Sequence, residues 1–340
     1  MKVAFIVDDN AAHLVTAKNA LADVYRTLAL SSAERMFQLL SEITPDLILL
    51  DVEMPEMNGF EALSILKSDE KFKTIPVIFL TEKHDAESEM RGFEMGAIDF
   101  INKPFSPPVL IRRIQTHIEM DRLIKESLRS VRNVHNATIS VLANLVENRD
   151  KITGKHIDRM QKYLSILVNE LVRAGVYPGE ISDWDLELLL PSAQLHDVGK
   201  IAISDLVLNK PEKLTEKEFR LIMRHSAEGE RIISDMIDRA KKEDGFLIHA
   251  KRFAGSHHEK WDGTGYPNGL RGEEIPLEGR IMAIADVYDA LISERPYKKP
   301  LSHEQAVEII KRESGTHFDP KIVDAFLNVA DDFLAESVSD

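Results

Sequence analysis

The stretch Lys2–Asn10, KVAFIVDDN, carries the pattern that decides the fold of the first third of the chain. A mostly apolar run typical of a buried strand ends directly in carboxylates. Further apolar runs end in polar residues at Leu47–Asp51, Pro76–Thr81 and Phe100–Lys103, and helical patterns separate them. This alternation predicts an α/β doubly wound parallel sheet, with a weaker strand around Thr27–Leu30.

Polar side chains follow these strands at the edge where parallel sheets bind their ligands. They are Asp8, Asp9, Asp51, Thr81 and Lys103. Three carboxylates suit Mg²⁺, one carboxylate can accept a phosphoryl group, and a lysine and a hydroxyl can hold the phosphate oxygens. Any one of the three aspartates alone is more simply a loop or N-cap residue. All five together at successive strand ends favour a phosphoryl-transfer site.

The motifs at these strand ends resemble those of a two-component receiver domain with a flavodoxin-like fold. They are IVDDN at 6–10, LLDVEMPEMNG at 49–59, FLTEK at 79–83 and INKPF at 101–105. The resemblance implies Asp51 as phosphoacceptor, Asp8 and Asp9 as Mg²⁺ ligands, and Thr81 and Lys103 as phosphate contacts. It also implies Phe100 as an aromatic switch and a sensor histidine kinase as partner.

Composition restricts what the rest of the chain can do. With 340 residues we expect two domains, and without any cysteine a metal must be held by His, Asp or Glu. The net charge of -14 argues against nucleic-acid binding. We find no secretory signal and no apolar run long enough to span a membrane, so we expect a cytoplasmic protein without a membrane partner.

A helical linker is expected between the two domains. Ser106 and Pro107 suit a helix start, and positions spaced by four and three residues run from Leu110 to Leu145. Aliphatic residues occupy seven of the eleven positions, and His117, Asp121, His135 and Thr138 interrupt them. Such a seam fits a homodimer through the linker helix, and equally a helix that packs on its own chain.

From Val141 onward the sequence predicts an all-α domain, which contains one prominent cluster of metal-ligating residue types. The stretch His257–Pro267, HHEKWDGTGYP, places two histidines before a glycine-rich loop. His196-Asp197 and Asp286 lie in apolar surroundings, where a carboxylate needs a partner. A lone histidine such as His225 is more often a surface residue. Together these side chains favour divalent transition metals, with ligands enough for two ions.

These residues resemble the HD-GYP subgroup of the HD-domain phosphohydrolases. The matching motifs are Thr153-Gly154-Lys155-His156 with Arg159, His196-Asp197-x-Gly199-Lys200, His225, His257-His258-Glu259, Gly265-Tyr266-Pro267, Asp286-x-x-Asp289 and Arg295-Pro296-Tyr297-Lys298. The resemblance implies the metal ligands His156, His196, Asp197, His225, His257, His258 and Asp286. It implies catalytic roles for Asp197, as a bridge between two ions, and for Lys200, at the scissile phosphate. Tyr266, Arg295 and Lys298 are the implied substrate contacts.

The resemblance implies hydrolysis of cyclic di-GMP to linear pGpG, and on to GMP in some members. Many members carry a glutamate four residues before the first histidine, where it helps to bind a third ion, and here that position is Ile152. We therefore expect two ions, of Fe, Mn, Ni, Zn or Co, and we hold the second cleavage in doubt. A low-activity cyclic di-GMP-binding adaptor and a hydrolase of another cyclic dinucleotide remain open.

The sequence thus predicts a multi-domain protein in three parts. A receiver domain spans residues 1–121, a helical linker spans 122–140, and an HD-GYP phosphohydrolase domain spans 141–340. The predicted function is a phosphorylation-regulated cyclic di-GMP phosphodiesterase.

Overall fold

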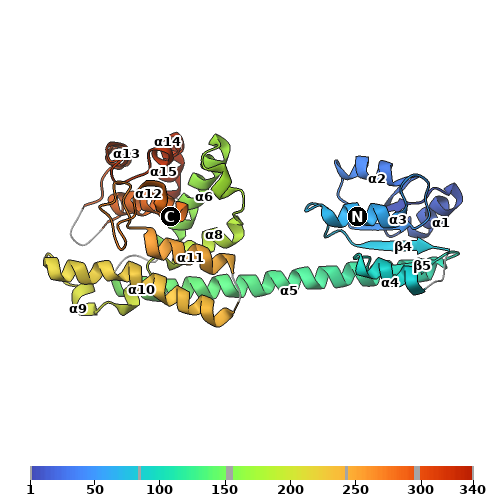
Figure 1. Cartoon of the computed structure of the whole chain (residues 1–340), viewed down its shortest axis with the longest axis horizontal. Coiled ribbons are helices and arrows are strands. Elements are labelled where there is room, and N and C mark those ends of the chain that lie inside the picture. Colours follow the sequence, from blue (N-terminus) through green and yellow to red (C-terminus); the bar gives the residue numbers. More distant parts are fainter. Residues whose placement is uncertain (1, 83–85, 151–155, 242–243, 295–298, 339–340) are drawn as a thin grey trace. The chain divides into compact units, whose positions relative to one another are not determined.

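The computed structural model of the protein describes residues 2–82, 86–150, 156–241, 244–294 and 299–338. The chain divides into two compact units, Met1–Val131 and Arg132–Asp340 (Figure 1). A single helix, α5 (Pro107–Glu147), begins in the first unit and ends in the second. Among the described residues, no helix combines the length and the apolar character needed to cross a membrane.

The first unit is built on a five-stranded parallel sheet in the order β2-β1-β3-β4-β5. The strands are β1 (Val3–Val7), β2 (Arg26–Leu30), β3 (Leu47–Asp51), β4 (Val77–Thr81) and β5 (Asp99–Asn102). Between them lie α1 (Ala11–Leu21), α2 (Ala33–Leu40), α3 (Gly59–Ser68) and α4 (Ala86–Glu94). This doubly wound topology confirms the fold predicted from the sequence. The weakly predicted strand is β2, which lies at the edge of the sheet and is only partly buried.

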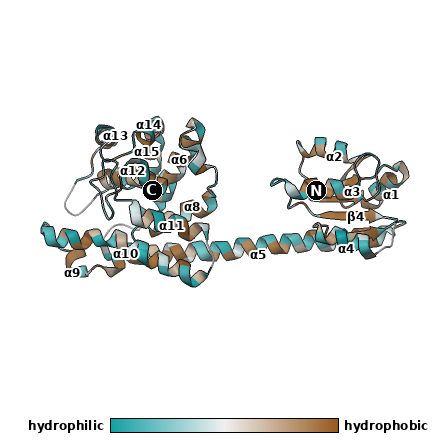
Figure 2. Cartoon of the chain, viewed as in Figure 1, coloured by the Kyte–Doolittle hydropathy of each residue, from teal (hydrophilic) through white to brown (hydrophobic). Residues whose placement is uncertain are grey.

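Both faces of the sheet are covered, which explains the continuous apolar runs. On one face Phe5, Ile48 and Phe79 pack with residues of α2 and α3. On the other face Ile6 and Leu49 pack with residues of α1 and the start of α5. Figure 2 shows the apolar character of strand β4 between its covering helices. Alternate residues of each strand therefore serve opposite cores, and only the strand ends are left for polar chemistry.

The second unit is helical, as predicted. Its longer helices are α6 (His156–Ala174), α8 (Leu186–Ser192), α10 (Glu216–Ala240), α11 (Gly245–Ser256), α12 (Leu277–Ile292), α13 (His303–Arg312), α14 (Pro320–Asn328) and α15 (Ala330–Val338). Short helical segments are η1 (Asn148–Asp150), α7 (Pro178–Ile181), η2 (Ala193–Leu195), η3 (Val198–Ala202), α9 (Asp205–Leu208) and η4 (Gly272–Glu274). Its main core joins α6, α12, α14 and α15 around Tyr163, Tyr288, Phe326 and Phe333.

Helix α5 changes its packing partners along its length. Leu110 and Ile114 are fully buried in the core of the first unit. Ile139 belongs to a small core with residues of α10 and α11 in the second unit, and Ala143 is buried as well. Large apolar side chains between these two regions are exposed. Of the aliphatic residues in the predicted seam, Leu110 and Ile114 are buried against their own chain, whereas those from Ile124 to Leu145 are exposed.

Candidate phosphoacceptor and metal sites

The carboxyl edge of the sheet gathers the five polar residues that the sequence singled out. Lys103 Nζ lies 2.7 Å from Asp8 Oδ2 and 2.8 Å from Asp51 Oδ2. Carboxylate oxygens of Asp8, Asp9 and Asp51 come within 4.8 Å of one another, close enough to share an ion. Burial raises the pKa of Asp51 above its usual value, although Lys103 opposes this shift. Thr81 ends β4 beside them and is buried.

Phe100 takes an inward position in this unit. Its ring is buried and lies 5.1 Å from the rings of Phe79 and Phe93. A cavity of about 560 Å³ is lined by Asp9, Thr81 and Phe100, among other residues. The Phe100 ring thus borders the same space as Asp9 and Thr81 at the carboxyl edge of the sheet.

The second unit brings the predicted metal ligands together around Asp197. His225 Nε2 lies 3.2 Å from Asp197 Oδ1, and His257 Nε2 lies 3.7 Å from the same oxygen. His196 Nε2 lies 3.4 Å from Asp197 Oδ2. One ligand atom from each of four residues lies within 4.8 Å of the others: Asp197, His225, His257 and His258.

A neighbouring group is formed by His156, which begins α6, with His196 and Glu147. His156 Nε2 lies 3.9 Å from Asp286 Oδ1 and 3.6 Å from Glu147 Oε1. All seven predicted ligands are therefore found in one region of the unit. Glu147 was not predicted from the sequence.

The local fold explains how these side chains meet. Asp197 lies between η2 and η3, His225 lies within α10, and His257 follows the last residue of α11. Segment η3 packs so closely on α10 that a Cβ at Gly199 would lie 1.9 Å from the carbonyl oxygen of His225. Only glycine permits this approach, which brings Asp197 against the histidine of α10.

Each of four histidines is oriented through its Nδ1 atom. This atom hydrogen-bonds a backbone carbonyl in three cases: Ala193 for His196 (2.9 Å), Ile222 for His225 (2.7 Å) and Phe253 for His257 (2.9 Å). In His156 the partner is the carboxylate of Asp289, at 2.7 Å. The partner of Nδ1 fixes the tautomer and leaves Nε2 available for a metal.

Asp289 thus positions the His156 ring. It belongs to the motif Asp286-x-x-Asp289, but the sequence did not predict a role for it. Arg159 donates from Nε to Asp289 Oδ1 at 2.6 Å and from Nη2 to Oδ2 at 3.0 Å. Although burial acts against the charged form, His156 and Arg159 hold the pKa of Asp289 at about 2. It is therefore a fixed anion behind His156 at neutral pH.

The electrostatics of the cluster suit a cation. Burial lowers the pKa of His257 to about 3 and that of His258 well below its usual value, so both imidazoles are neutral at pH 7, which is the form that binds a metal. Burial acts against the charged form of Asp197, but Lys200 and His196 hold its pKa well below the usual range. Burial acts to lower the pKa of His196, but the negative charge of Asp197 outweighs this effect and raises the pKa to about 9.

Several buried atoms of the cluster have no hydrogen-bond partner among the described residues. They are both carboxylate oxygens of Glu147, Nε2 of His196 and Oδ1 of Asp197. Buried polar atoms are rarely left unsatisfied in native proteins. Imidazole nitrogens and carboxylate oxygens that face one another without partners are the donor set of a divalent transition metal, so the residues present fit such an ion.

Lys200 and the glycine-rich loop border the cluster. Lys200 Nζ lies 2.8 Å from Asp197 Oδ2. The ring of Tyr266 lies 4.7 Å from that of His258, and its backbone N–H donates to the carbonyl of His258. A Cβ at Gly265 would lie 2.3 Å from the backbone nitrogen of Lys260, so the loop folds tightly on its own start.

Glu259 holds this loop in place. It is buried, and its carboxylate accepts hydrogen bonds from the backbone N–H groups of Asn268 (2.7 Å) and Leu270 (3.0 Å). Glu259 belongs to the motif His257-His258-Glu259, but the sequence did not predict a role for it. Parts of the sequence interpretation lie outside the described residues, namely Lys83, the positions 152–155, with Ile152, and the positions 295–298, with Arg295 and Lys298.

Comparison with known proteins covers both units. Residues 4–115 match the response regulator receiver domain, and residues 140–322 match the HD domain. A probable cyclic di-GMP phosphodiesterase of Vibrio cholerae is 41% identical, over 97% of this chain and 78% of the relative. The cyclic di-GMP phosphodiesterase response regulator RpfG of Xanthomonas campestris is 36% identical, over 83% of this chain and 75% of the relative. A 3'3'-cGAMP-specific phosphodiesterase 2 of Vibrio cholerae is 41% identical, over 57% of this chain and 34% of the relative.

The orientation of His156 can be tested through Asp289. The change Asp289→Asn removes the anion that accepts from His156 Nδ1 and should lower the affinity for Mn²⁺ by about 10–100-fold. Calorimetric titration of metal-free protein with Mn²⁺ measures this affinity. Asp235→Asn on the exposed face of α10, where Asp235 pairs with Arg231, is the control. Equal affinities in both variants would show that Asp289 does not position a metal ligand.

Proposed function

The chain belongs to the response regulators that join a receiver domain to an HD domain, and from this premise we propose that it is a phosphorylation-regulated, metal-dependent phosphodiesterase that converts cyclic di-GMP to linear pGpG. The observation that carries the proposal is the buried cluster around Asp197, with its unpartnered ligand atoms. The names of relatives at 36% and 41% identity support the substrate.

Two divalent ions suit the cluster. One ligand set comprises Asp197, His225, His257 and His258, and the other comprises Glu147, His156 and His196, with Asp286 beside His156. Asp197 faces both sets, because its two oxygens lie near different histidines. Fe, Mn, Ni, Zn and Co all accept such ligands. When bound, divalent ions of this kind supply Lewis acidity and an activated water for attack on a phosphodiester.

The chain's own residues bind and orient the substrate. Lys200 is a cation at the edge of the cluster, placed to neutralise charge that develops on the scissile phosphate oxygens. The Tyr266 ring, held against His258 by the loop that Glu259 clamps, offers an aromatic face and a phenol to the nucleotide. Arg295 and Lys298 remain proposed contacts to the nucleotide on the strength of the motif alone.

A second candidate substrate is a mixed purine cyclic dinucleotide. The observation in its favour is the relative at 41% identity whose name specifies 3'3'-cGAMP. The adaptor interpretation rested on the missing carboxylate at Ile152. A carboxylate near His156 is nevertheless present, at Glu147, which weakens that argument.

Turnover tests the proposed function. Protein loaded with Mn²⁺ or Fe²⁺ should convert cyclic di-GMP to pGpG, and chromatography detects the product. The variants His196→Ala and Asp197→Ala should lose metal and turnover together. No turnover at full metal content would instead support the adaptor, and faster turnover of 3'3'-cGAMP would support the second substrate. Activity retained in either variant would contradict the assigned metal site.

Regulation is proposed to start at Asp51. A phosphoryl group from a sensor histidine kinase would add about -1.5 to -2 charges beside Lys103 and Thr81, with Mg²⁺ held by Asp8 and Asp9. The adjoining cavity allows the Phe100 ring to move toward Thr81. Phosphorylation would thereby change the surface next to α5, which packs on the same sheet.

The variant Asp51→Ala isolates this step. We expect it to keep the basal turnover of cyclic di-GMP, because Asp51 lies in the other unit from the metal cluster, but to lose the response to acetyl phosphate. Turnover before and after treatment with the phosphoryl donor is the measurement. A response of the same size in the variant would show that the receiver domain signals by another route.

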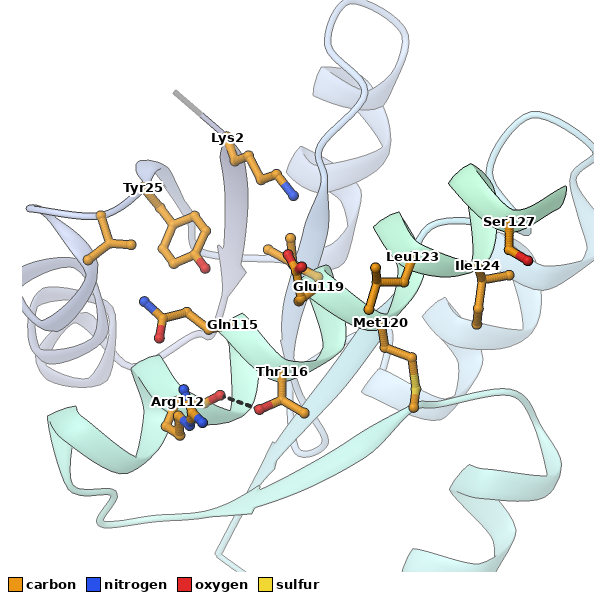
Figure 3. A pocket seen from close by; sticks show the side chains of 12 residues that line it. Lys2, Tyr25, Arg112, Gln115, Thr116, Glu119, Met120, Leu123, Ile124 and Ser127 are labelled. Carbon is orange, nitrogen blue, oxygen red and sulfur yellow. Dashed lines mark hydrogen bonds between the residues drawn. The ribbon is translucent and has the colours of Figure 1, made fainter. Parts of the chain in front are cut away.

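A second copy of the chain is the proposed partner of the middle of α5. Met120, Ile124, Val131 and Val134 are 53–66% exposed and follow one another at four- and three-residue spacing through Ser127. The charged residues between them pair within the helix, as in Lys125–Asp121 and Arg122–Glu126. Met120, Ile124 and Ser127 also line a cavity of about 900 Å³ in the first unit. Figure 3 shows these side chains on α5, with Tyr25 and Lys2 from the receiver core.

Sedimentation measures this association. The double variant Ile124→Glu with Val131→Glu places charges on the stripe and should shift a wild-type dimer to monomers in analytical ultracentrifugation. Arg129→Glu, on the charged side of the same helix, should leave the dimer intact. A wild-type chain that sediments as a monomer at micromolar concentration would contradict the proposal.

A further inference from the structure

Glu147 is the last residue of α5, and its carboxylate is buried beside the metal-ligand histidines of the second unit. The residue is 2% exposed. Its Oε1 lies 3.6 Å from His156 Nε2, and one of its oxygens comes within 4.8 Å of ligand atoms of both His156 and His196. The carboxylate thus lies next to the Nε2 atoms that the two oriented rings present.

The described residues provide no hydrogen bond for this carboxylate. Neither of its oxygens has a donor among the described residues. The other neighbouring ring atom, His156 Nδ1, is already engaged with Asp289. Burying a carboxylate without a partner is costly, so its position calls for a cation.

The surroundings hold the carboxylate in this place firmly. Val146 and Ala143 bury the end of α5 in the second unit. Arg149, two residues further on, donates to the carbonyl oxygens of Lys200, Ile201 and Ile203 and pairs with Asp205. These bonds fasten the end of the helix to the segment that follows Asp197, so Glu147 keeps a fixed distance from the cluster.

We propose that Glu147 is a metal ligand that completes the set of His156 and His196. This inference rests on the proposed function in treating the cluster as a metal centre. It revises the expectation, drawn from Ile152, that the cluster lacks such a carboxylate: the residue comes from the helix nine positions before the first histidine. One helix then contributes both to the core of the receiver unit, through Leu110 and Ile114, and to the metal centre.

The variants Glu147→Gln and Glu147→Ala test the assignment by metal binding and thermal unfolding. Both should bind Mn²⁺ at least about 10-fold more weakly at one of the sites, measured by calorimetric titration with elemental analysis of the stoichiometry. Both should also show a smaller rise of Tm on addition of Mn²⁺. Glu126→Gln, on the exposed part of α5, is the control and should behave as the wild type.

Thermal unfolding of the metal-free protein shows whether Glu147 is a metal ligand or a residue that stabilises the fold. If Glu147 is a ligand, metal-free Glu147→Gln should have the same Tm as metal-free wild type or a higher one, because an unpartnered buried charge has been removed. A lower Tm with unchanged Mn²⁺ affinity would overturn the inference. Neither measurement needs substrate, so absent turnover in the wild type would count against the proposed function alone.

Discussion

Charged and polar side chains in a protein interior must be satisfied by one another or by cations, and this constraint shapes the second unit around Asp197. The aspartate remains an anion although it is buried, because Lys200 and His196 compensate its charge. His257 and His258 are kept neutral by the same burial. The result is a buried cluster of imidazole nitrogens and carboxylate oxygens, several of them without a hydrogen-bond partner among the described residues, and such a donor set suits a divalent metal.

The fold provides this arrangement through rigid elements. The candidate ligands come from five helices or their ends, α5, α6, α10, α11 and α12, and from the turn between η2 and η3. The absence of a side chain at Gly199 lets this turn approach α10. Carbonyl groups and Asp289 fix the rings from behind. The receiver unit uses the same strategy at its sheet edge, where Lys103 holds two aspartates in place.

The sequence predicted most of this because the decisive residues lie in local patterns. Apolar runs that end in aspartate located β1 and β3, and adjacent His257-His258 located the buried cluster that could hold metal. The role of Asp289 depends on a contact with His156, 133 residues away, which no local pattern reveals. Glu147 was missed for a similar reason, since only the packing of α5 on the second unit brings it to His156. The linker seam left two interpretations open, because α5 packs on its own chain near both ends while the aliphatic seam residues from Ile124 to Leu145 stay exposed.

The proposed metal centre can be tested most directly by anomalous diffraction from crystals of the protein loaded with Mn²⁺. The account predicts one peak within bonding distance of Asp197, His225, His257 and His258, and a second beside His156 and His196 with a Glu147 oxygen among its ligands. Difference maps with no anomalous peak in this cluster, at full Mn²⁺ occupancy elsewhere in the chain, would contradict it.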